Sequence, residues 1–457
     1  MIPSNRIRKI HFIGIGGAGM SGIAEILHRS QFVITGSDPM GSPVVQNMRT
    51  LGIKIQESHL AENVHEADLV VYSSAIREDN AERQECIRLA IPCIRRAEML
   101  GELMRLKYTL AISGTHGKTT TTSILGHLWL TAQRDPTLIV GGVVRNLGTG
   151  ARHGSDGTLI AEADEYDRSF LEMVPSSVIL TNVEADHLDC YKDLDEIKEA
   201  FIQFCNKVPF YGLLVACIDD GGVRSILGKI KKPIMTYGFF RQADYRIENL
   251  EMAQGKAQWN LIYNGNDLGR FELPLAGQHN VLNAVGATAL ALQEGISISD
   301  VQKGLSTFGG VKRRMEHHGV FNSIELYDDY AHHPTEVEAT LTGIRENYPQ
   351  SRIIVLFQPH LFSRTQDLYQ EFASALLGSD KCLVLPIYGA REEPIEGVSS
   401  DLIIHSAREQ GHSQIDTLSE EGEIIEWVKE NTQQGDIVMT MGAGPVWKMI
   451  SKIGDAL

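Results

Sequence analysis

Apolar runs of strand length alternate with amphipathic stretches of helix length over the first hundred residues. The runs at 10–15, 32–37 and 68–75 are apolar, and a stretch with helical spacing begins near Met20. This alternation is the rhythm of βαβ units, whose strands pair in parallel. It predicts an α/β domain over residues 1–106.

The same rhythm starts again at Tyr108 and a third time after residue 312. Between them, residues 245–275 switch to strict alternation around Asn264-Gly265, a pair typical of the turn in a β-hairpin. The sequence therefore predicts three α/β domains, at 1–106, 107–312 and 313–457, with a small antiparallel β addition in the second.

Composition and charge narrow the class of protein. A chain of 457 residues with 43% apolar and 22% charged residues has the make-up of a globular α/β enzyme. The net charge of -16 disfavours nucleic acid and anionic membrane as partners. Six irregularly spaced cysteines indicate reduced thiols and a cytosolic location. The apolar segment near the N-terminus is short and broken by glycine, so we interpret it as a strand, and no run suits a membrane-spanning helix.

The first predicted strand ends in a GxGxxG turn made of Gly14, Gly16, Gly17, Ala18 and Gly19. Such a turn lets the backbone approach a diphosphate at the start of the next helix. Asp38 follows the second strand, where a dinucleotide enzyme binds ribose, so an NAD-dependent oxidoreductase is one interpretation. The diphosphate of a UDP-sugar fits the same geometry, and a tight turn without a ligand is a third interpretation.

A second glycine-rich loop joins a strand to a helix and consists of Gly114, Thr115, His116, Gly117, Lys118, Thr119 and Thr120. Backbone amides at a helix start favour phosphate, Lys118 would reach the β and γ oxygens, and Thr119 would hold Mg²⁺. Ile112 stands where the standard P-loop has its first glycine, so this is a shorter GTxGKT form. Because consecutive threonines are poor helix formers, the run 119–122 favours a role in nucleotide binding.

Acidic side chains follow the two predicted strands at 159–163 and 177–183. The first strand contains Glu162, and the second is followed by the segment 184–189, which includes His187. Parallel strands place both clusters on the rim where the phosphate loop lies. There they could bind Mg²⁺ that bridges ATP to an anionic acceptor, whereas solvated loop charges are the alternative interpretation.

Two further segments have polar residues that suit a nucleotide. The segment 277–284 opens a helix whose His279, Asn280 and Asn283 could hydrogen-bond an adenine edge, although such residues are also common at helix starts. Arg313 follows the second boundary, where its charge could reach a γ-phosphate or be simply solvated.

The third domain has histidines and an arginine behind two strands. The segment 328–336 places Tyr330 and His332 at a helix entry, for which we expect a capping box of Thr335 and Glu338. Because neighbouring side chains diverge, zinc binding by His332 and His333 is disfavoured against acid-base or substrate contact. The segment 358–365 carries His360 and Arg364, and Arg364 could clamp a carboxylate or be a surface arginine.

Taken together, these ordered motifs resemble the Mur ligase family. The motifs are GIGGAGMSGIAE, GTHGKTTTT, EADEYD, TNVEADHLD, GQHNVLNA, DDYAHHPTE, QPHLFSRT and the tail TMGAG at 440–444. The resemblance implies a Rossmann-like N-terminal domain that binds a UDP-sugar, a central P-loop ATPase-like domain, and a Rossmann-like C-terminal domain that binds an amino acid. The implied reaction is ATP-dependent and Mg²⁺-dependent ligation of L-alanine to the carboxylate of UDP-N-acetylmuramate through an acyl phosphate, in peptidoglycan synthesis.

The resemblance also implies roles for individual residues, motif by motif. The glycine turn with Asp38, Ser73 and Ser74 would bind the UDP-sugar, and Tyr330, His332, His360 and Arg364 the amino acid. The loop 114–120 with His279, Asn280 and Asn283 would bind ATP, and Thr119, Glu162 and His187 the metal. The groups implied in catalysis are Lys118, His187, Arg313 and His332. Sister ligases carry a carbamylated lysine where this chain has Phe201 and Ile202, so we expect none here.

Three other functions stay open at this point. A recycling ligase that attaches a whole tripeptide to the same sugar is the nearest one, although its first loop usually carries a cysteine and bulkier residues. An NAD-dependent oxidoreductase and a nucleotide-binding switch without catalysis are the others. The sequence gives no indication of oligomeric state.

Overall fold

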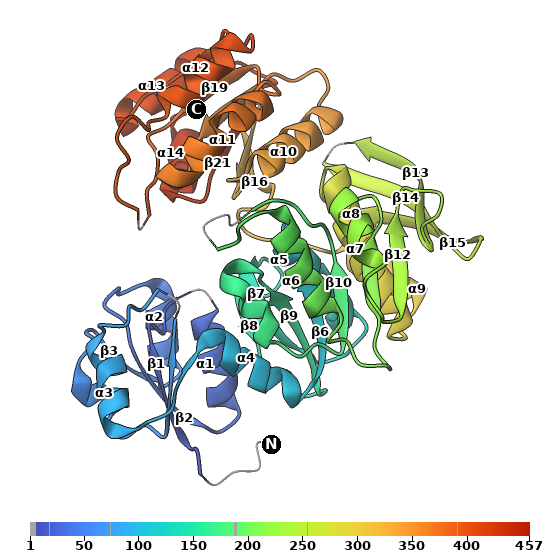
Figure 1. The fold of residues 1–457 in the computed structure, drawn as a ribbon. Helices are drawn as coiled ribbons and strands as arrows, with labels where there is room; N and C mark the ends of the chain where they lie inside the picture. The colour runs from blue at the N-terminus through green and yellow to red at the C-terminus, as the bar shows by residue number, and fades with distance from the viewer. Residues whose placement is uncertain (1–5, 18, 74, 187–189, 254, 391) are drawn as a thin grey trace. The chain divides into compact units, whose positions relative to one another are not determined.

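Three β-sheets organise the chain in the computed structural model, which describes residues 6–17, 19–73, 75–186, 190–253, 255–390 and 392–457 (Figure 1). By contacts the chain divides into two compact units. One comprises Met1–Glu248, Asn260–Gly269 and Leu282–Phe308, and the other Asn249–Trp259, Arg270–Val281 and Gly309–Leu457. The expected α/β class with parallel sheets is confirmed, whereas the boundaries at residues 106 and 312 stay predictions.

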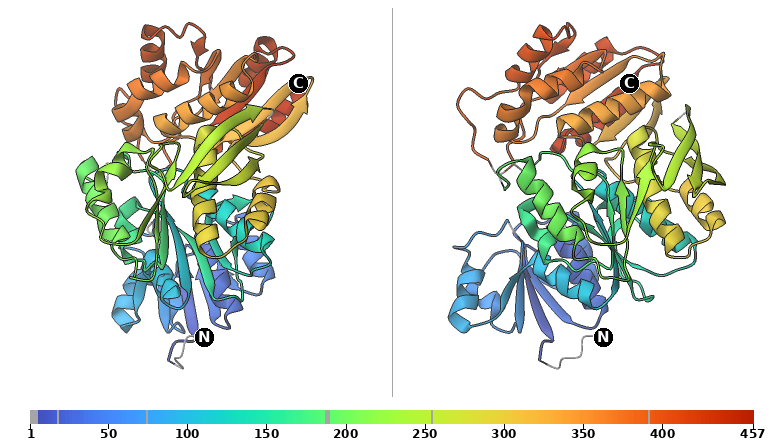
Figure 2. Two further views of the ribbon diagram at one scale, coloured as in Figure 1. Left: turned by 90° about the vertical axis from the view of Figure 1, so that its right-hand side faces the viewer. Right: turned by 45° about the vertical axis from the view of Figure 1, so that its right-hand side comes forward.

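The first sheet has five parallel strands in the order β3-β2-β1-β4-β5. They are β1 (Lys9–Ile13), β2 (Val33–Ser37), β3 (Lys54–Gln56), β4 (Leu69–Tyr72) and β5 (Cys93–Arg95). The helical segments are α1 (Met20–Arg29), α2 (Pro43–Thr50), η1 (Ala61–Val64), α3 (Ala81–Leu89) and α4 (Arg96–Arg105), and they flank the sheet on both sides (Figure 2). Residues 10–13 are buried throughout, as expected for a parallel strand covered on both faces.

The second sheet has ten strands in the order β15-β14-β13-β12-β11-β10-β6-β9-β7-β8. The strands are β6 (Tyr108–Ser113), β7 (Thr137–Val144), β8 (Thr149–Arg152), β9 (Thr158–Ala163), β10 (Ser177–Leu180), β11 (Leu214–Cys217), β12 (Ile234–Gly238), β13 (Tyr245–Ala253), β14 (Lys256–Tyr263) and β15 (Asn266–Leu273). The expected hairpin is confirmed, because Asn264 and Gly265 join β14 to β15 with φ of 49° and 78°. Positive φ at both turn residues is the signature of a type I′ turn.

Helices connect the strands of this second sheet. They are α5 (Lys118–Thr131), η2 (Tyr166–Glu172), α6 (Leu194–Cys205), α7 (Gly221–Leu227), α8 (Gln278–Gln293) and α9 (Ile298–Ser306). β6 lies between β10 and β9 and runs parallel to both. The carboxyl ends of these three strands therefore share one edge, as the sequence predicted.

The third sheet has six strands in the order β16-β17-β21-β18-β19-β20, and only its β16–β17 pair is antiparallel among the described pairs. The strands are β16 (Glu316–Phe321), β17 (Ile324–Asp329), β18 (Ile353–Phe357), β19 (Lys381–Val384), β20 (Ile415–Asp416) and β21 (Ile437–Met441). The helical segments are α10 (Pro334–Asn347), α11 (Phe362–Leu376), α12 (Asp401–Glu409), α13 (Glu421–Asn431), η3 (Pro445–Lys448) and α14 (Met449–Ala456).

The start of α10 corrects one expectation. The helix begins at Pro334, its N-cap is His333, and the capping carboxylate is Glu336, which accepts from the His333 N–H at 3.3 Å. The predicted capping box of Thr335 and Glu338 is wrong, because proline is favoured at the first helical position and so fixes where the helix begins.

The structure also bears on the cysteines, on membrane-spanning helices and on Phe201 and Ile202. None of the six cysteines, all of which lie within the described ranges, forms a disulfide. Within the described ranges, no helix combines the length and the apolar character needed to cross a membrane. Phe201 and Ile202, the position at which no carbamylated lysine is expected, are buried in α6.

Candidate active site

The loop between β6 and α5 is the centre of the predicted nucleotide site. Gly114 and Gly117 adopt φ of 137° and 81°, which side chains other than glycine rarely adopt. A Cβ at Gly117 would overlap Asn283 Oδ1, and one at Gly114 would overlap Thr181 Oγ1. Glycine is therefore required at both positions, because Gly117 lies very close to α8 and Gly114 lies very close to the end of β10.

The segment after β10 shapes this loop through hydrogen bonds. The His116 N–H donates to Asn182 Oδ1 at 2.7 Å, and Asn182 Nδ2 donates back to the His116 carbonyl at 3.1 Å. The Glu184 N–H donates to Thr115 Oγ1 at 2.9 Å. Asn182 thus holds the loop in place through two hydrogen bonds to the main chain of His116, a role that the sequence did not indicate.

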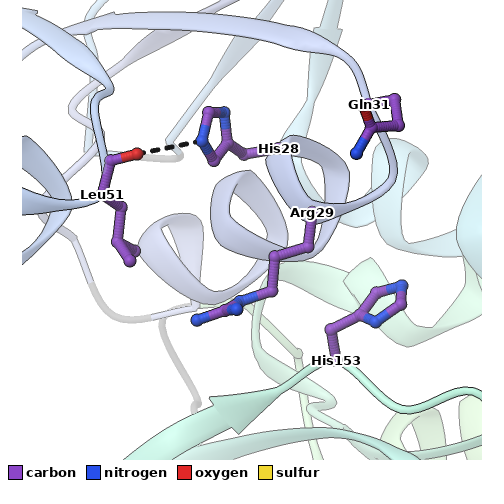
Figure 3. Close-up of a pocket in the computed structure, with 5 residues that line it drawn as sticks. All are labelled: His28, Arg29, Gln31, Leu51 and His153. Atoms are coloured by element: carbon purple, nitrogen blue, oxygen red, sulfur yellow. Dashed lines mark hydrogen bonds between the residues drawn. The ribbon is translucent and has the colours of Figure 1, made fainter.

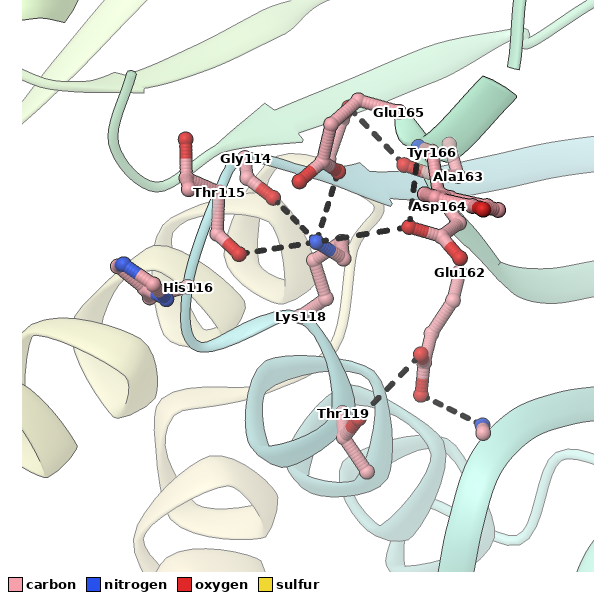
Figure 4. A network of polar contacts seen from close by, with 12 residues as sticks. Gly114, Thr115, His116, Lys118, Thr119, Glu162, Ala163, Asp164, Glu165 and Tyr166 are labelled. Carbon is pink, nitrogen blue, oxygen red and sulfur yellow. Dashed lines mark hydrogen bonds and ion pairs between the residues drawn. The ribbon is translucent and has the colours of Figure 1, made fainter. Parts of the chain in front are cut away.

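Lys118 is held by acceptors of the protein itself (Figure 4). Its ammonium group donates to the Gly114 carbonyl at 2.7 Å, to the Thr115 carbonyl at 3.0 Å and to Glu165 Oε2 at 2.7 Å. Burial alone would lower the pKa of Lys118, but the charges of Glu165 and Asp164 outweigh burial and raise it. The lysine therefore stays charged, as phosphate binding requires.

Thr119 and Glu162 meet at the rim where the sequence places a metal. Thr119 Oγ1 donates to Glu162 Oε2 at 3.3 Å, and the Gly141 N–H donates to Glu162 Oε1 at 2.7 Å. Burial raises the pKa of Glu162, while Gly141 and Lys118 act to lower it. A hydroxyl and a carboxylate are the hard oxygen donors that Mg²⁺ prefers, so these residues fit that ion.

The glycine turn after β1 lies against the end of β4. Gly14 and Gly19 have φ of 75° and 74°, and Gly19 is the N-cap of α1. A Cβ at Gly14 would lie 3.5 Å from Ser73 Cβ, so Ser73 borders the turn. Ala18 and Ser74, also predicted to contact the UDP-sugar, lie outside the described residues.

Asp38 supports the turn directly. Its Oδ2 accepts from the Gly16 N–H at 2.8 Å, and its Oδ1 accepts from the Met40 N–H at 2.9 Å. With 9% of its surface exposed and both oxygens bonded to the main chain, the carboxylate is used to fix the backbone. This arrangement favours a structural role for Asp38 over recognition of a nucleotide ribose.

Arg96 also lies beside this turn, although it was not among the residues predicted from the sequence. It is the first residue of α4, and its Nη1 would lie 3.0 Å from a Cβ placed on Gly19. A guanidinium is therefore next to the turn that is expected to bind a diphosphate. The only sequence signal was the pair Arg95-Arg96, which stands where the short strand β5 meets α4.

Arg313 is folded onto the segment that follows β21. Its Nη2 donates to the carbonyls of Gly442 and Gly444, its Nη1 donates to that of Ala443, and its Nε lies 3.5 Å from Asp328 Oδ2. The guanidinium carbon lies 4.7 Å from the centroid of the Tyr330 ring. With 22% of the side chain exposed, Arg313 is held by this segment rather than solvated.

Aromatic rings gather at the carboxyl ends of β17 and β18. The His332 ring centroid lies 5.1 Å from that of Tyr330 and 5.8 Å from that of His360. His332 Nδ1 is 3.0 Å from the Tyr330 carbonyl and 3.1 Å from Glu336 Oε2. Three of the residues predicted to contact the amino acid, Tyr330, His332 and His360, thus lie together. Glu336, which was not predicted from the sequence, lies beside His332.

The remaining predicted contacts lie at the starts of two helices. Arg364 stands in the first turn of α11, the helix that follows His360. His279, Asn280 and Asn283 stand in the first two turns of α8. Burial lowers the pKa of His279 to about 4, so its imidazole is neutral and able to accept a hydrogen bond. His187, predicted to contact metal and phosphate, lies outside the described residues.

A separate cavity of about 510 Å³ is lined by His28, Arg29, Gln31, Leu51 and His153 (Figure 3). His28 Nε2 lies 3.0 Å from the Leu51 carbonyl. Burial, together with the charges of Lys107 and Arg29, lowers the pKa of His153. None of the lining residues belongs to the predicted sites.

Family models match the chain in three consecutive ranges. The model "Mur ligase family, catalytic domain" matches residues 9–108, "Mur ligase middle domain" matches 112–291, and "Mur ligase, glutamate ligase domain" matches 313–444.

Curated relatives match over nearly the full length. The UDP-N-acetylmuramate--L-alanine ligase of Geobacter sp. (strain M21) is 44% identical, with 97% of this chain and 96% of the relative covered. The enzyme of the same name from Salinibacter ruber is also 44% identical, with 97% and 94% covered.

Solved structures show the same fold. The UDP-N-acetylmuramate-alanine ligase of Thermotoga maritima aligns with a TM-score of 0.82 at 27% identity, covering 98% of both chains. A murein peptide ligase of Psychrobacter arcticus aligns with a TM-score of 0.72 at 25% identity, again covering 98% of both chains.

Proposed function

The chain belongs to the Mur ligase family, and on that premise we propose that it joins L-alanine to the carboxylate of UDP-N-acetylmuramate while ATP is cleaved to ADP and phosphate. The observation that carries the proposal is 44% identity over 97% of the chain to relatives named for this reaction. The product is a precursor of peptidoglycan, and the proposed location is the cytoplasm.

The phosphate loop would bind the triphosphate of ATP. The loop leads directly into the N-terminus of α5, where backbone N–H groups favour phosphate, and Lys118 supplies a positive charge there. Asn283 lies against Gly117 and would contribute to the nucleotide site beside the loop. His279 and Asn280, in the first turn of α8, would contact adenine. Thr119, Glu162 and His187 would hold Mg²⁺, which neutralises phosphate charge.

The muramic carboxylate is a poor electrophile, so the reaction needs an activated acyl group. Transfer of the γ-phosphoryl group to a carboxylate oxygen gives an acyl phosphate and ADP. The amine of alanine then attacks the acyl carbon, the amide bond forms, and phosphate leaves. Negative charge develops as the γ-phosphate of ATP approaches the muramic carboxylate. This charge would be stabilised by Lys118, His187 and Arg313.

The amino acid would bind at the ends of β17 and β18. Arg364 would pair with the alanine carboxylate, and Tyr330 and His360 would line the pocket. His332 would accept the proton of the attacking amine, because Glu336 at 3.1 Å orients its ring as a carboxylate orients a catalytic histidine.

The glycine turn after β1 would bind the UDP diphosphate. Asp38 fixes the turn through Gly16, and Arg96 stands beside Gly19 to balance the diphosphate charge. Ser73 and Ser74 would contact the uridine half.

A mixed-substrate assay tests the proposal. Purified protein with ATP, Mg²⁺, UDP-N-acetylmuramate and L-alanine should release phosphate and form a product with the mass of the alanine amide, and omission of alanine should stop both. Phosphate release that requires a preformed tripeptide would support the recycling ligase instead. NADH binding without ATP binding would support an oxidoreductase, and ATP binding without any ligated product would support a switch.

A further inference from the structure

Each N–H donor of the Lys118 ammonium group has a protein acceptor in this structure. It has three N–H donors, and three protein acceptors lie within 3.0 Å: the carbonyls of Gly114 and Thr115 and the carboxylate of Glu165. A phosphate oxygen can therefore bind this ammonium group only if one of these acceptors releases it.

Glu165 is the acceptor whose charge matters most. Its side chain is only 2% exposed, whereas Asp164, the next carboxylate, lies 3.8 Å from the ammonium group and is 44% exposed. A buried ion pair is screened far less than an exposed one. Glu165 therefore competes directly with a phosphate for Lys118, while solvent weakens the attraction of Asp164.

The position of Glu165 is fixed by its main chain. The hydroxyl of Tyr191 donates to the Glu165 carbonyl at 2.7 Å, and Tyr191 is itself buried. When Lys118 moves toward a ligand, the carboxylate can follow it only by side-chain rotation, because the main chain of Glu165 is held in place.

We propose that Glu165 is the resting counter-ion of Lys118, which holds the lysine in the empty loop and gives it up to a nucleotide phosphate. This positioning role rests on the proposed ATP site and deepens it, because it makes nucleotide binding an exchange of one anion for another at a single ammonium group.

The exchange has a consequence for protons. Burial raises the pKa of Glu165 to about 7, although Lys118 beside it acts to lower it. Within the described residues, the other titratable groups that act on this pair are Asp164, Glu162 and Tyr191, which are acidic. Loss of Lys118 to a phosphate therefore raises the pKa of Glu165 further, and the buried carboxylate takes up a proton as nucleotide binds.

Calorimetry in two buffers tests this coupling. A non-hydrolysable ATP analogue with Mg²⁺ is titrated into the full-length protein at about pH 7.5, in one buffer with a large and one with a small heat of ionisation. We expect uptake of up to about one proton per nucleotide. Glu165→Gln should abolish the uptake, and Glu199→Gln, which changes an exposed carboxylate of α6, should leave it intact.

The KM for ATP gives a second test, because replacement of a residue with a purely structural role would not lower it. Glu165→Gln should lower the KM for ATP by about 3- to 10-fold, because a neutral amide no longer competes for Lys118 and more of the protein is ready to bind. The kcat should stay within about twofold.

Two results would overturn the proposal. One is nucleotide binding by the unmodified protein without proton uptake, a measurement that does not depend on whether the variant folds. The other is a folded Glu165→Gln protein whose proton uptake equals that of the unmodified protein, or whose KM for ATP rises. Absence of binding heat in both buffers would instead overturn the ATP site itself, so the two failures are distinguishable.

Discussion

The Thr119 hydroxyl faces the Glu162 carboxylate, with 3.3 Å between Oγ1 and Oε2, across the gap between the phosphate loop and the end of β9. The two groups come from elements more than forty residues apart in the chain, and the parallel pairing of β6 with β9 brings them together. The proposed Mg²⁺ ligand set therefore depends on the register of two strands.

Replacement of Glu162 by Gln should weaken Mg²⁺ binding. A neutral amide keeps the shape of the side chain but loses the charge, so the Mg²⁺ concentration for half-maximal activity should rise about 10- to 100-fold. Phosphate release measured over a Mg²⁺ series checks this. An unchanged Mg²⁺ requirement would remove Glu162 from the ligand set.

Lys118→Met should abolish most of the catalysis. Loss of a charge that stabilises the transferring phosphoryl group costs about 100- to 1000-fold in kcat. The control is Lys229→Met, which replaces an exposed lysine outside the site. If the Lys118 variant kept more than about a tenth of the activity, the lysine would not act on the transferred group.

Arg96→Gln should weaken binding of the UDP-sugar alone. Removal of a guanidinium beside the diphosphate turn should raise the KM for UDP-N-acetylmuramate about tenfold and leave the KM for alanine unchanged. Arg105→Gln is the matched control, because it changes an exposed arginine of the same helix that pairs with Glu102. Equal effects of the two substitutions would argue against a contact with the diphosphate.

Arg364→Lys should raise the KM for alanine about tenfold or more, because a lysine cannot bind a carboxylate through two parallel hydrogen bonds. Initial rates at varied alanine and saturating ATP give this value. Arg408→Lys, on α12, serves as the control. A wild-type KM for alanine would place the amino-acid carboxylate elsewhere.

His279 should make the protein sensitive to acid. Its pKa falls from 6.5 to about 4 on burial, so the unfolded chain binds more protons between these values, and stability is lost as the pH falls through them. The loss should amount to about 1 to 3 kcal/mol, since the side chain is partly exposed. Urea unfolding of His279→Gln should show a weaker dependence on pH between about 6.5 and 4. His405→Gln, on α12, should behave as the unmodified protein does.

Local signals in the sequence were sufficient for much of the fold. The Asn264-Gly265 pair locates its hairpin because both residues tolerate positive φ, and the alternation of runs locates the parallel strands. The cap of α10 was misplaced because the polar spacing of Thr335 and Glu338 was given more weight than the preference of Pro334 for the first helical position.

The sequence was less informative about which side chains meet within the site. Glu165 was visible as one carboxylate of an acidic cluster, but its selection over Asp164 as the partner of Lys118 depends on burial, which only the folded chain determines. Arg96 and Asn182 were not predicted, because each contacts a loop that is distant from it in sequence.

The close approach of Gly117 to Asn283 also restricts how the chain can vary. Any larger residue at position 117 would meet the Asn283 side chain and would need a strained backbone as well. A smaller residue at 283 would relieve only the first of these two costs. Among related sequences, substitutions at the two positions should therefore be rare and should occur together, so this pair is a place to look for covariation between the loop and α8.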